Sequence, residues 1–522
     1  MLQAQERAAR LLIVSVAAFA VAVAGFPPVA EAACGRRVPL TGGSLDGRRP
    51  LCPPASTGGE ESSVPVPRLE GPITGGSGAP FVAGTSFALA DVGYEAVEYF
   101  ISGTAAAYVN ASAIGSDGRW RVAEASTAPY KTRILVYRPI DPARFNGIAF
   151  LEWLNVSGGL DAAPVWITGH VELMREGYAW IGVSAQWAGV EGPSGIPGLN
   201  LGGLKINDPE RYGSLSHPGD SFSYDIYSQA GQAVRHGDGP LGQLEAEILI
   251  AAGESQSASR MTTYVNAIHP VANVFDAFLV HSRGAGSAAL SQDPQPEIRT
   301  PANVRIRTDD DEPVLQFQTE SDTIRHVPAR QPDLGRHRLW EVAGTAHADT
   351  YTLLIGWTDL GDDPAIADVV VTAEPIPGII ECTSPINSGP QHYVLNAAIH
   401  ALERWVRTGS GPRPSPRLDV EGTPYAFALD DVGNVEGGIR TPWVDAPVAV
   451  LSGLGQTGAQ FCSLFGTTVP LDEAELRALY PDHETYVAAV ARSADRAVRF
   501  GYLLEEDAEL IKLRAEQVDI GG

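Results

Sequence analysis

The chain has 522 residues, of which 44% are hydrophobic and 19% charged, the balance of an ordinary globular protein rather than a disordered one. It carries 37 Lys and Arg residues against 62 Asp and Glu residues, a formal net charge of −25. Because nucleic-acid binding requires a basic surface, this balance argues against DNA or RNA as a partner.

The first 33 residues have the pattern of a secretory signal peptide. Two arginines come before an apolar stretch, residues 11–25, and Ala-Glu-Ala at 30–32 forms a small-x-small cleavage site. The apolar stretch is shorter than the roughly 20 residues that a membrane span needs. We therefore expect cleavage near Ala32 or Ala33 and a soluble, secreted or periplasmic protein without stable membrane insertion.

An exported chain with four cysteines is expected to form two disulfides. Four cysteines allow three pairings, and the local pairing would join Cys34 to Cys52 and Cys382 to Cys462. Neither pair has the spacing of a zinc site, so the sequence predicts no metal centre.

The domain organisation follows from changes in pattern along the chain. Residues 34–65 form a lead-in rich in Gly, Pro and Ser, and residues 66–522 are expected to form one domain. Two early β-type runs, 96–101 and 132–137, indicate partly antiparallel strands. A strand at 147–154, a helix at 164–175 and a strand at 177–184 then follow. This rhythm is typical of parallel strands joined by right-handed crossovers.

Residues 186–220 interrupt the rhythm with many Gly, Pro and Asn residues, and we expect a long lid-like insertion there. Beyond it the chain alternates again and then becomes largely helical over 391–522. The expected elements are a helix at 224–234, strands at 248–252, 274–280, 313–319 and 338–343, and helices at 393–406, 473–480, 486–500 and 505–517. The fold class is therefore α/β, with a mostly parallel central sheet flanked by helices.

The candidate nucleophile is Ser255, which follows the apolar run 248–252. The sequence Gly253-Glu-Ser-Gln-Ser257 lies between that strand and small residues that can open a helix. This is the pattern of a nucleophile elbow, a tight strand-to-helix turn that exposes the serine hydroxyl. The general G-x-S-x-G pattern has glycine where this chain has Ser257.

A serine hydroxyl needs a base, and the base needs an orienting acid. The strand at 313–319 is followed by Glu320 and Asp322, and the next strand is followed by His347. Of the eleven histidines, only His347 lies just beyond the strand that follows the acid. Parallel sheets present catalytic groups at the carboxyl ends of their strands. The sequence thus predicts Ser255, His347 and one acid, with Asp322 favoured and Glu320 as the alternative.

The oxyanion hole is expected to use two backbone N–H groups. One belongs to Gln256, directly after the nucleophile, and the other to the loop after the strand at 147–154, at Asn155 or Val156.

Six motifs across residues 65 to 515 resemble those of a large, mostly bacterial group of alpha/beta hydrolase domain proteins. They lie at 130–133 (YKTR), 152–156 (EWLNV), 208–212 (DPERY), 253–257 (GESQS), 341–349 (EVAGTAHAD) and 437–442 (GGIRTP). Ser257 matches the elbow of this group. The resemblance implies the α/β-hydrolase fold and a Ser-Asp/Glu-His hydrolase, and it brings no substrate.

The resulting hypothesis is an exported hydrolase of small-molecule carboxylic esters that needs no metal or organic cofactor. Two alternatives stay open. The same triad can serve an amidase, a lactonase or an acyltransferase, and a non-catalytic protein can bind ligands on a hydrolase scaffold. Nothing in the sequence indicates the oligomeric state.

Overall fold

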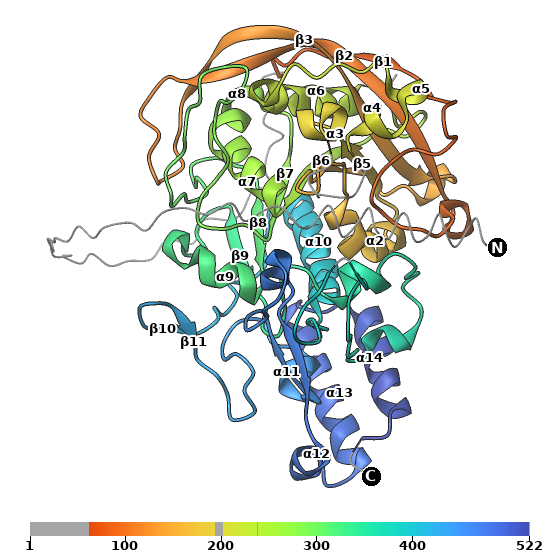
Figure 1. Cartoon of the computed structure of the whole chain (residues 1–522), viewed down its shortest axis with the longest axis vertical. Coiled ribbons are helices and arrows are strands. Elements are labelled where there is room, and N and C mark those ends of the chain that lie inside the picture. The colour runs from red at the N-terminus through yellow and green to blue at the C-terminus, as the bar shows by residue number, and fades with distance from the viewer. Residues whose placement is uncertain (1–61, 194–201, 237–238, 379, 521–522) are drawn as a thin grey trace, which may run out of the picture.

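The structure is a computed structural model that describes residues 62–193, 202–236, 239–378 and 380–520 (Figure 1). The predicted signal peptide, most of the lead-in, and Cys34 and Cys52 lie outside the described residues.

A nine-stranded sheet forms the centre of the molecule, in the order β1-β2-β3-β5-β4-β6-β7-β8-β9. The first three strands pair antiparallel, β3 joins β5 antiparallel, and every pair from β5 to β9 is parallel. The strands are β1 Arg68–Glu70, β2 Tyr94–Asn110, β3 Val122–Pro139, β4 Ile148–Trp153, β5 Ala179–Val183, β6 Ile248–Glu254, β7 Ala277–His281, β8 Val314–Gln318 and β9 His337–Glu341.

Helices cover both faces of the sheet, because the parallel strands are apolar on both sides. Along β7, Phe278 and Val280 join the core on one face, whereas Ala277 and Leu279 join the core on the other. The first face packs against α6 (Ser223–Arg235), α7 (Gln256–Thr263) and α8 (His269–Ala272). The second face packs against α2 (Pro164–Arg175) and α10 (Gln391–Thr408).

The β2–β3 hairpin is longer than the sequence predicts. Its strands have 17 and 18 residues and pair along their whole length, curving over one end of the molecule (Figure 1). The added parts, about residues 102–110 and 122–131, are rich in Ala, Ser and Thr and lack a regular apolar alternation. Pairing between the two strands, rather than hydrophobic pattern, therefore defines this extension.

The insertion at 186–220 contains three short helices in its described part: α3 (Trp187–Glu191), α4 (Leu204–Asn207) and α5 (Pro209–Tyr212). Leu204, Tyr212 and Leu215 pack with Phe100 of β2 in a small apolar cluster. The insertion is thus attached to the hairpin side of the sheet.

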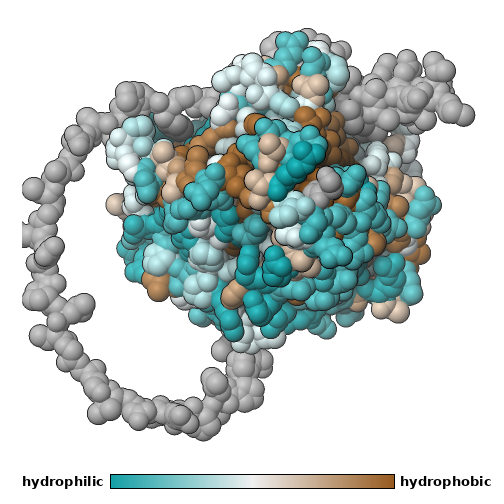
Figure 2. Space-filling model, turned by 90° about the horizontal axis from the view of Figure 1, so that it is seen from below, coloured by the Kyte–Doolittle hydropathy of each residue, from teal (hydrophilic) through white to brown (hydrophobic). Residues whose placement is uncertain are grey.

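The C-terminal part is less helical than expected. After α10 the chain forms short strand pairs and loops before it returns to helices. These helices lie at the end of the molecule seen in Figure 2, where apolar and hydrophilic surfaces lie side by side. The elements are β10 Val420–Glu421, β11 Ala426–Phe427, α11 Pro442–Asp445, β12 Ala449–Ser452, β13 Thr467–Pro470, α12 Glu473–Leu479, α13 His483–Phe500 and α14 Glu505–Gln517. The prediction of a largely helical 391–522 is therefore wrong for residues 409–470.

Candidate active site

Ser255 lies on the sharp turn between β6 and α7. Its φ of 58° and ψ of −116° are unusual for a residue with a side chain and store strain of about 1–3 kcal/mol. Its N–H donates to the carbonyl of His281 on β7 (2.9 Å). A Cβ at Gly253 would lie 2.7 Å from the Ser257 carbonyl oxygen, so only glycine fits there. Strand and helix thus hold a serine, 7% exposed, at the carboxyl edge of the sheet.

His347 follows β9, and its Nδ1 lies 2.7 Å from the Oδ1 of Asp322. Asp322 belongs to α9 (Glu320–His326), directly after β8, and its Oδ2 accepts a hydrogen bond from Thr319 (2.6 Å). Burial alone would raise the pKa of Asp322, but His347 and the Thr319 hydroxyl lower it to about 2. The acid therefore stays ionised and holds the imidazole from one side.

Glu320, the alternative acid, lies elsewhere. Its carboxylate accepts the N–H groups of Gly344 (2.5 Å) and Gly453 (2.7 Å), and burial raises its pKa to about 8. It therefore joins the start of the His347 loop to the C-terminal part of the chain. The imidazole contacts Asp322 instead.

The Nε2 of His347 lies 3.3 Å from Oε1 of Glu254, the residue directly before Ser255. The loop after β9 thus reaches the turn after β6 across two intervening strands. Glu254 is not among the site residues predicted from the sequence. The available signal was a carboxylate at the end of an otherwise apolar strand, where it becomes buried.

The two candidate oxyanion donors after β4 differ in whether their backbone N–H is already hydrogen-bonded. The Asn155 N–H donates to the Ala162 carbonyl (2.9 Å), so the prediction of Asn155 as a donor is wrong. Within the described part of the chain, the Val156 N–H makes no hydrogen bond. Gln256 is the first residue of α7, whose leading N–H groups have no carbonyl partner in the helix. Val156 and Gln256 therefore remain as the candidate pair.

A buried ionic cluster holds the loop that carries Val156. Arg133, fully buried on β3, contacts Asp161 of that loop (2.6 Å) and Glu98 of β2 (3.5 Å). Ser184, after β5, also bonds Asp161. Removing one member of a buried ionic cluster leaves an uncompensated charge, which costs about 3–5 kcal/mol. The cluster therefore fixes the loop relative to the sheet.

The insertion meets the site at two places. Asp220, near its end, accepts a hydrogen bond from Arg260 of α7 (2.9 Å). A Cβ at Gly189 of α3 would lie 3.2 Å from Val156 and closer still to Asp161. The described part of the insertion therefore lies against α7 and the loop after β4, while its role as a lid stays a prediction.

The C-terminal part supports the His347 loop through backbone contacts. The Ala343 N–H donates to Ile439 (3.0 Å), the Asn387 side chain donates to the Gly344 carbonyl (3.1 Å), and the Ala348 N–H donates to Leu464 (3.2 Å). These bonds hold the loop on both sides of the imidazole.

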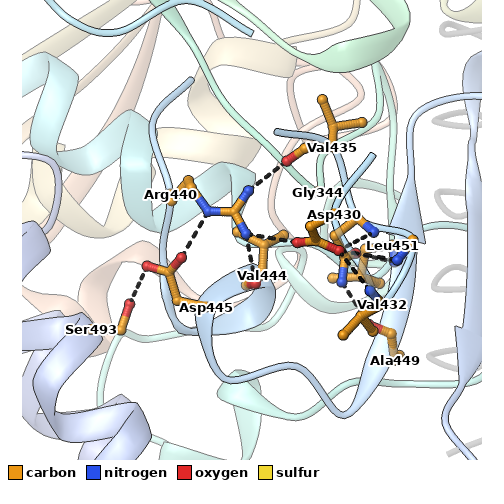
Figure 3. Close-up of polar contacts among 12 residues, drawn as sticks. Gly344, Asp430, Val432, Val435, Arg440, Val444, Asp445, Ala449, Leu451 and Ser493 are labelled. Atoms are coloured by element: carbon orange, nitrogen blue, oxygen red, sulfur yellow. Dashed lines mark hydrogen bonds and ion pairs between the residues drawn. The ribbon is translucent and has the colours of Figure 1, made fainter. Parts of the chain in front are cut away.

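Arg440 of the GGIRTP motif links the segments that hold this loop (Figure 3). Its guanidinium binds Asp445 (2.7 Å), Asp430 (3.0 Å) and the carbonyls of Val435 and Val444. It therefore joins segments of the C-terminal part next to Gly344 (Figure 3).

The disulfide between Cys382 and Cys462, one of the two predicted, is present. Cys462 packs in the same small apolar cluster as Ala348, the residue after His347. The disulfide therefore adds a covalent link beside the same loop.

Within the described ranges, no helix combines the length and apolar character of a membrane span, and no three His, Cys, Asp or Glu side chains gather as metal ligands.

The sequence model of the family described as "Alpha/beta hydrolase domain" matches residues 69–512. Three of the solved structures that are similar to the chain are the following. An esterase from the fungus Rhizomucor miehei has 12% identity, 59% coverage of this chain, 86% of its own and a TM-score of 0.29. A Klebsiella pneumoniae protein provisionally named dienelactone hydrolase has 14% identity, with 46% of this chain and 85% of its own covered, and a TM-score of 0.23. A rice cell wall degrading esterase from Xanthomonas oryzae has 13% identity, with 37% of this chain and 44% of its own covered, and a TM-score of 0.21. No curated protein sequence matches the chain.

Proposed function

Because the chain belongs to the alpha/beta hydrolase domain family, we propose that it is a serine hydrolase that cleaves carboxylic esters. One observation carries the proposal. His347 is bound by Asp322 through Nδ1 at 2.7 Å, while its Nε2 lies 3.3 Å from the residue next to Ser255. An acid on one ring nitrogen, with the other ring nitrogen beside the turn that carries a serine, supports acyl transfer through a covalent intermediate.

In the proposed reaction, His347 Nε2 takes the hydroxyl proton of Ser255 while the serine Oγ bonds to the ester carbonyl carbon. The carbonyl π electrons move to oxygen, and the N–H groups of Gln256 and Val156 stabilise the resulting oxyanion. The imidazolium then gives its proton to the departing alcohol. Water, deprotonated by His347, releases the acid from the acyl-enzyme and restores the serine.

A fluorophosphonate probe tests the nucleophile. We expect stoichiometric labelling of Ser255 in the wild type and none in Ser255→Ala, with peptide mass spectrometry locating the adduct. Ser259, on the same helix, offers a matched control, since Ser259→Ala should label normally. Folded protein that hydrolyses an ester but is not labelled at Ser255 would contradict the mechanism.

A substrate panel tests the reaction class. Short p-nitrophenyl esters, anilides, lactones and an added acceptor alcohol should give fastest turnover for the esters. Preference for amides, lactones or transfer to the alcohol would replace the ester specificity and keep the triad. A ligand that binds equally to wild type and Ser255→Ala, with no turnover of any substrate, would identify a binding protein instead.

Export is a further part of the proposal. The disulfide Cys382–Cys462 supports it, because structural disulfides persist in oxidising compartments. N-terminal sequencing of protein recovered outside the cytoplasm should begin at Ala33 or Cys34. Recovery of full-length protein that begins at Met1, from the cytoplasm only, would contradict it.

A further inference from the structure

Two carboxylates face the imidazole of His347, one on each ring nitrogen. Asp322 contacts Nδ1 through a 2.7 Å hydrogen bond. Glu254 contacts Nε2, with its Oε1 at 3.3 Å, and is 1% exposed. A Ser-His-Asp mechanism uses only the first of these anions, so the second requires its own explanation.

The contact with Glu254 is electrostatic rather than a strong hydrogen bond. Within the described residues, Glu254 Oε1 accepts no hydrogen bond. Its Oε2 and its backbone carbonyl are both within reach of the Asn155 amide (3.4 and 3.2 Å), which fixes the side chain. The carboxylate can therefore act on the ring through its charge while a serine proton approaches Nε2 from another direction.

The other titratable groups around this pair contribute less. Asp322 is the anion on the opposite ring nitrogen, and Arg325 of α9 opposes the two acids. His281 of β7 is neutral, because burial lowers its pKa to about 3. Glu152 of β4 is buried, but its carboxylate binds the N–H groups of Val165 and Trp166. Glu254 is therefore the anion closest to the reacting nitrogen.

We propose that Glu254 is a second anionic partner of His347 that stabilises the imidazolium formed when Ser255 attacks the substrate. This inference rests on the proposed function. When the serine proton moves to Nε2 and Oγ bonds to the carbonyl carbon, the ring gains a positive charge between two carboxylates. An interaction that strengthens as the charge develops lowers the barrier.

The pair also sets the pH range of activity. Burial lowers the pKa of His347, but Asp322 and Glu254 outweigh burial and raise it from 6.5 to about 9. Burial raises the pKa of Glu254 and the positive charge of the imidazolium opposes that rise, so the ionised carboxylate and the imidazolium stabilise each other. The base works only when Nε2 is unprotonated, so activity should rise with pH inside the window from 6.5 to 9.

Glu254→Gln tests the inference, with Glu152→Gln as the control. Both residues are buried glutamates with raised pKa values, but the carboxylate of Glu152 binds the N–H groups of Val165 and Trp166. The pKa of His347 is followed by NMR of histidine-labelled protein, and kcat/KM for an ester is measured against pH.

We expect Glu254→Gln to lower the pKa of His347 by about one pH unit or more, the effect of losing an opposite charge within 4–6 Å. The acid limb of kcat/KM should shift down by the same amount. Above that limb, kcat/KM should fall by about an order of magnitude, because a less basic imidazole accepts the proton less readily. Glu152→Gln should leave both pKa and limb nearly unchanged.

An unchanged His347 pKa in Glu254→Gln, or a shift of equal size in Glu152→Gln, would overturn the inference. If Glu254→Gln does not fold, the wild type decides, since a His347 pKa at or below 6.5 would also overturn it. Failure of the proposed function is separate. In that case His347 responds to Glu254 as expected, but Ser255 is neither labelled nor required for turnover.

Discussion

Replacing each of the two acids after β8 should show which one is needed for activity and which one for stability. Asp322→Asn removes the charge that faces Nδ1 of His347, 2.7 Å away. Glu320→Gln removes the carboxyl group that accepts the N–H groups of both Gly344 and Gly453. The two residues are two positions apart on one helix, so each serves as the control for the other.

For Asp322→Asn, the neighbouring Thr319 decides the orientation of the new amide. The Thr319 hydroxyl donates to Oδ2, so the amide oxygen takes that place and the NH2 group faces His347. Nδ1 must then accept a hydrogen bond, which puts the ring proton on Nε2 and removes the base. This wrong tautomer costs about 10⁴-fold in kcat in Ser-His-Asp enzymes, and we expect a loss of 10³ to 10⁴-fold here.

For Glu320→Gln, the amide keeps one acceptor oxygen and turns its NH2 toward the other N–H group. One buried backbone donor then loses its partner, which costs about 1–3 kcal/mol. The expected result is a fall in Tm of a few degrees. At temperatures well below Tm, kcat/KM should decrease less than 10-fold, because Asp322 still orients His347.

The assay combines steady-state ester hydrolysis with thermal unfolding of both variants at pH 8. A large loss of kcat/KM in Glu320→Gln together with near-normal turnover in Asp322→Asn would refute the assignment of the acid.

Three further predictions concern stability. Ser255→Gly should abolish activity and raise Tm. Tm should rise because relief of about 1–3 kcal/mol of backbone strain outweighs the entropic cost of glycine, about 0.5–1 kcal/mol. An unchanged or lower Tm would show that the turn at Ser255 is not strained. Arg133→Met should lower the free energy of unfolding by about 3–5 kcal/mol, since it leaves the buried Asp161 carboxylate without its cation, whereas Lys131→Met, on the partly exposed pair with Glu70, should cost less than about 1 kcal/mol. The pKa of Asp322 is lowered from 3.8 to about 2, so its ionised form, through all its contacts together, stabilises the fold by about 2 kcal/mol above pH 3.8; the Tm difference between wild type and Asp322→Asn should therefore shrink as the pH falls toward 2.

Several elements could be predicted from local sequence because local forces define them. The helix at 164–175 and the helix at 505–517 were predicted with the observed bounds. The parallel strands were found as short apolar runs, and their carboxyl ends indicated the candidate site residues. Apolar runs and helical periodicity show which residues of a segment are buried, and this pattern can be read from the sequence of that segment alone.

Other features depend on partners far away in the chain. Whether Asn155 or Val156 has a free N–H depends on the bridge to Ala162, which no local pattern reveals. Glu254 gains its role only because the loop after β9 returns to the end of β6. The buried polar contacts that decide these cases are tertiary, so sequence periodicity contains no signal for them.

The C-terminal part shows why the candidate site depends on residues far beyond His347. The backbone around the imidazole bonds to Ile439 and Leu464 rather than to neighbouring residues, and Glu320 reaches Gly453. A buried backbone N–H or carbonyl needs a partner, so the loop depends on these segments for its conformation. The strands there have only two to four residues and are held by such contacts more than by their own propensity. The same contacts that conceal the region from sequence prediction thus make it an integral part of the site.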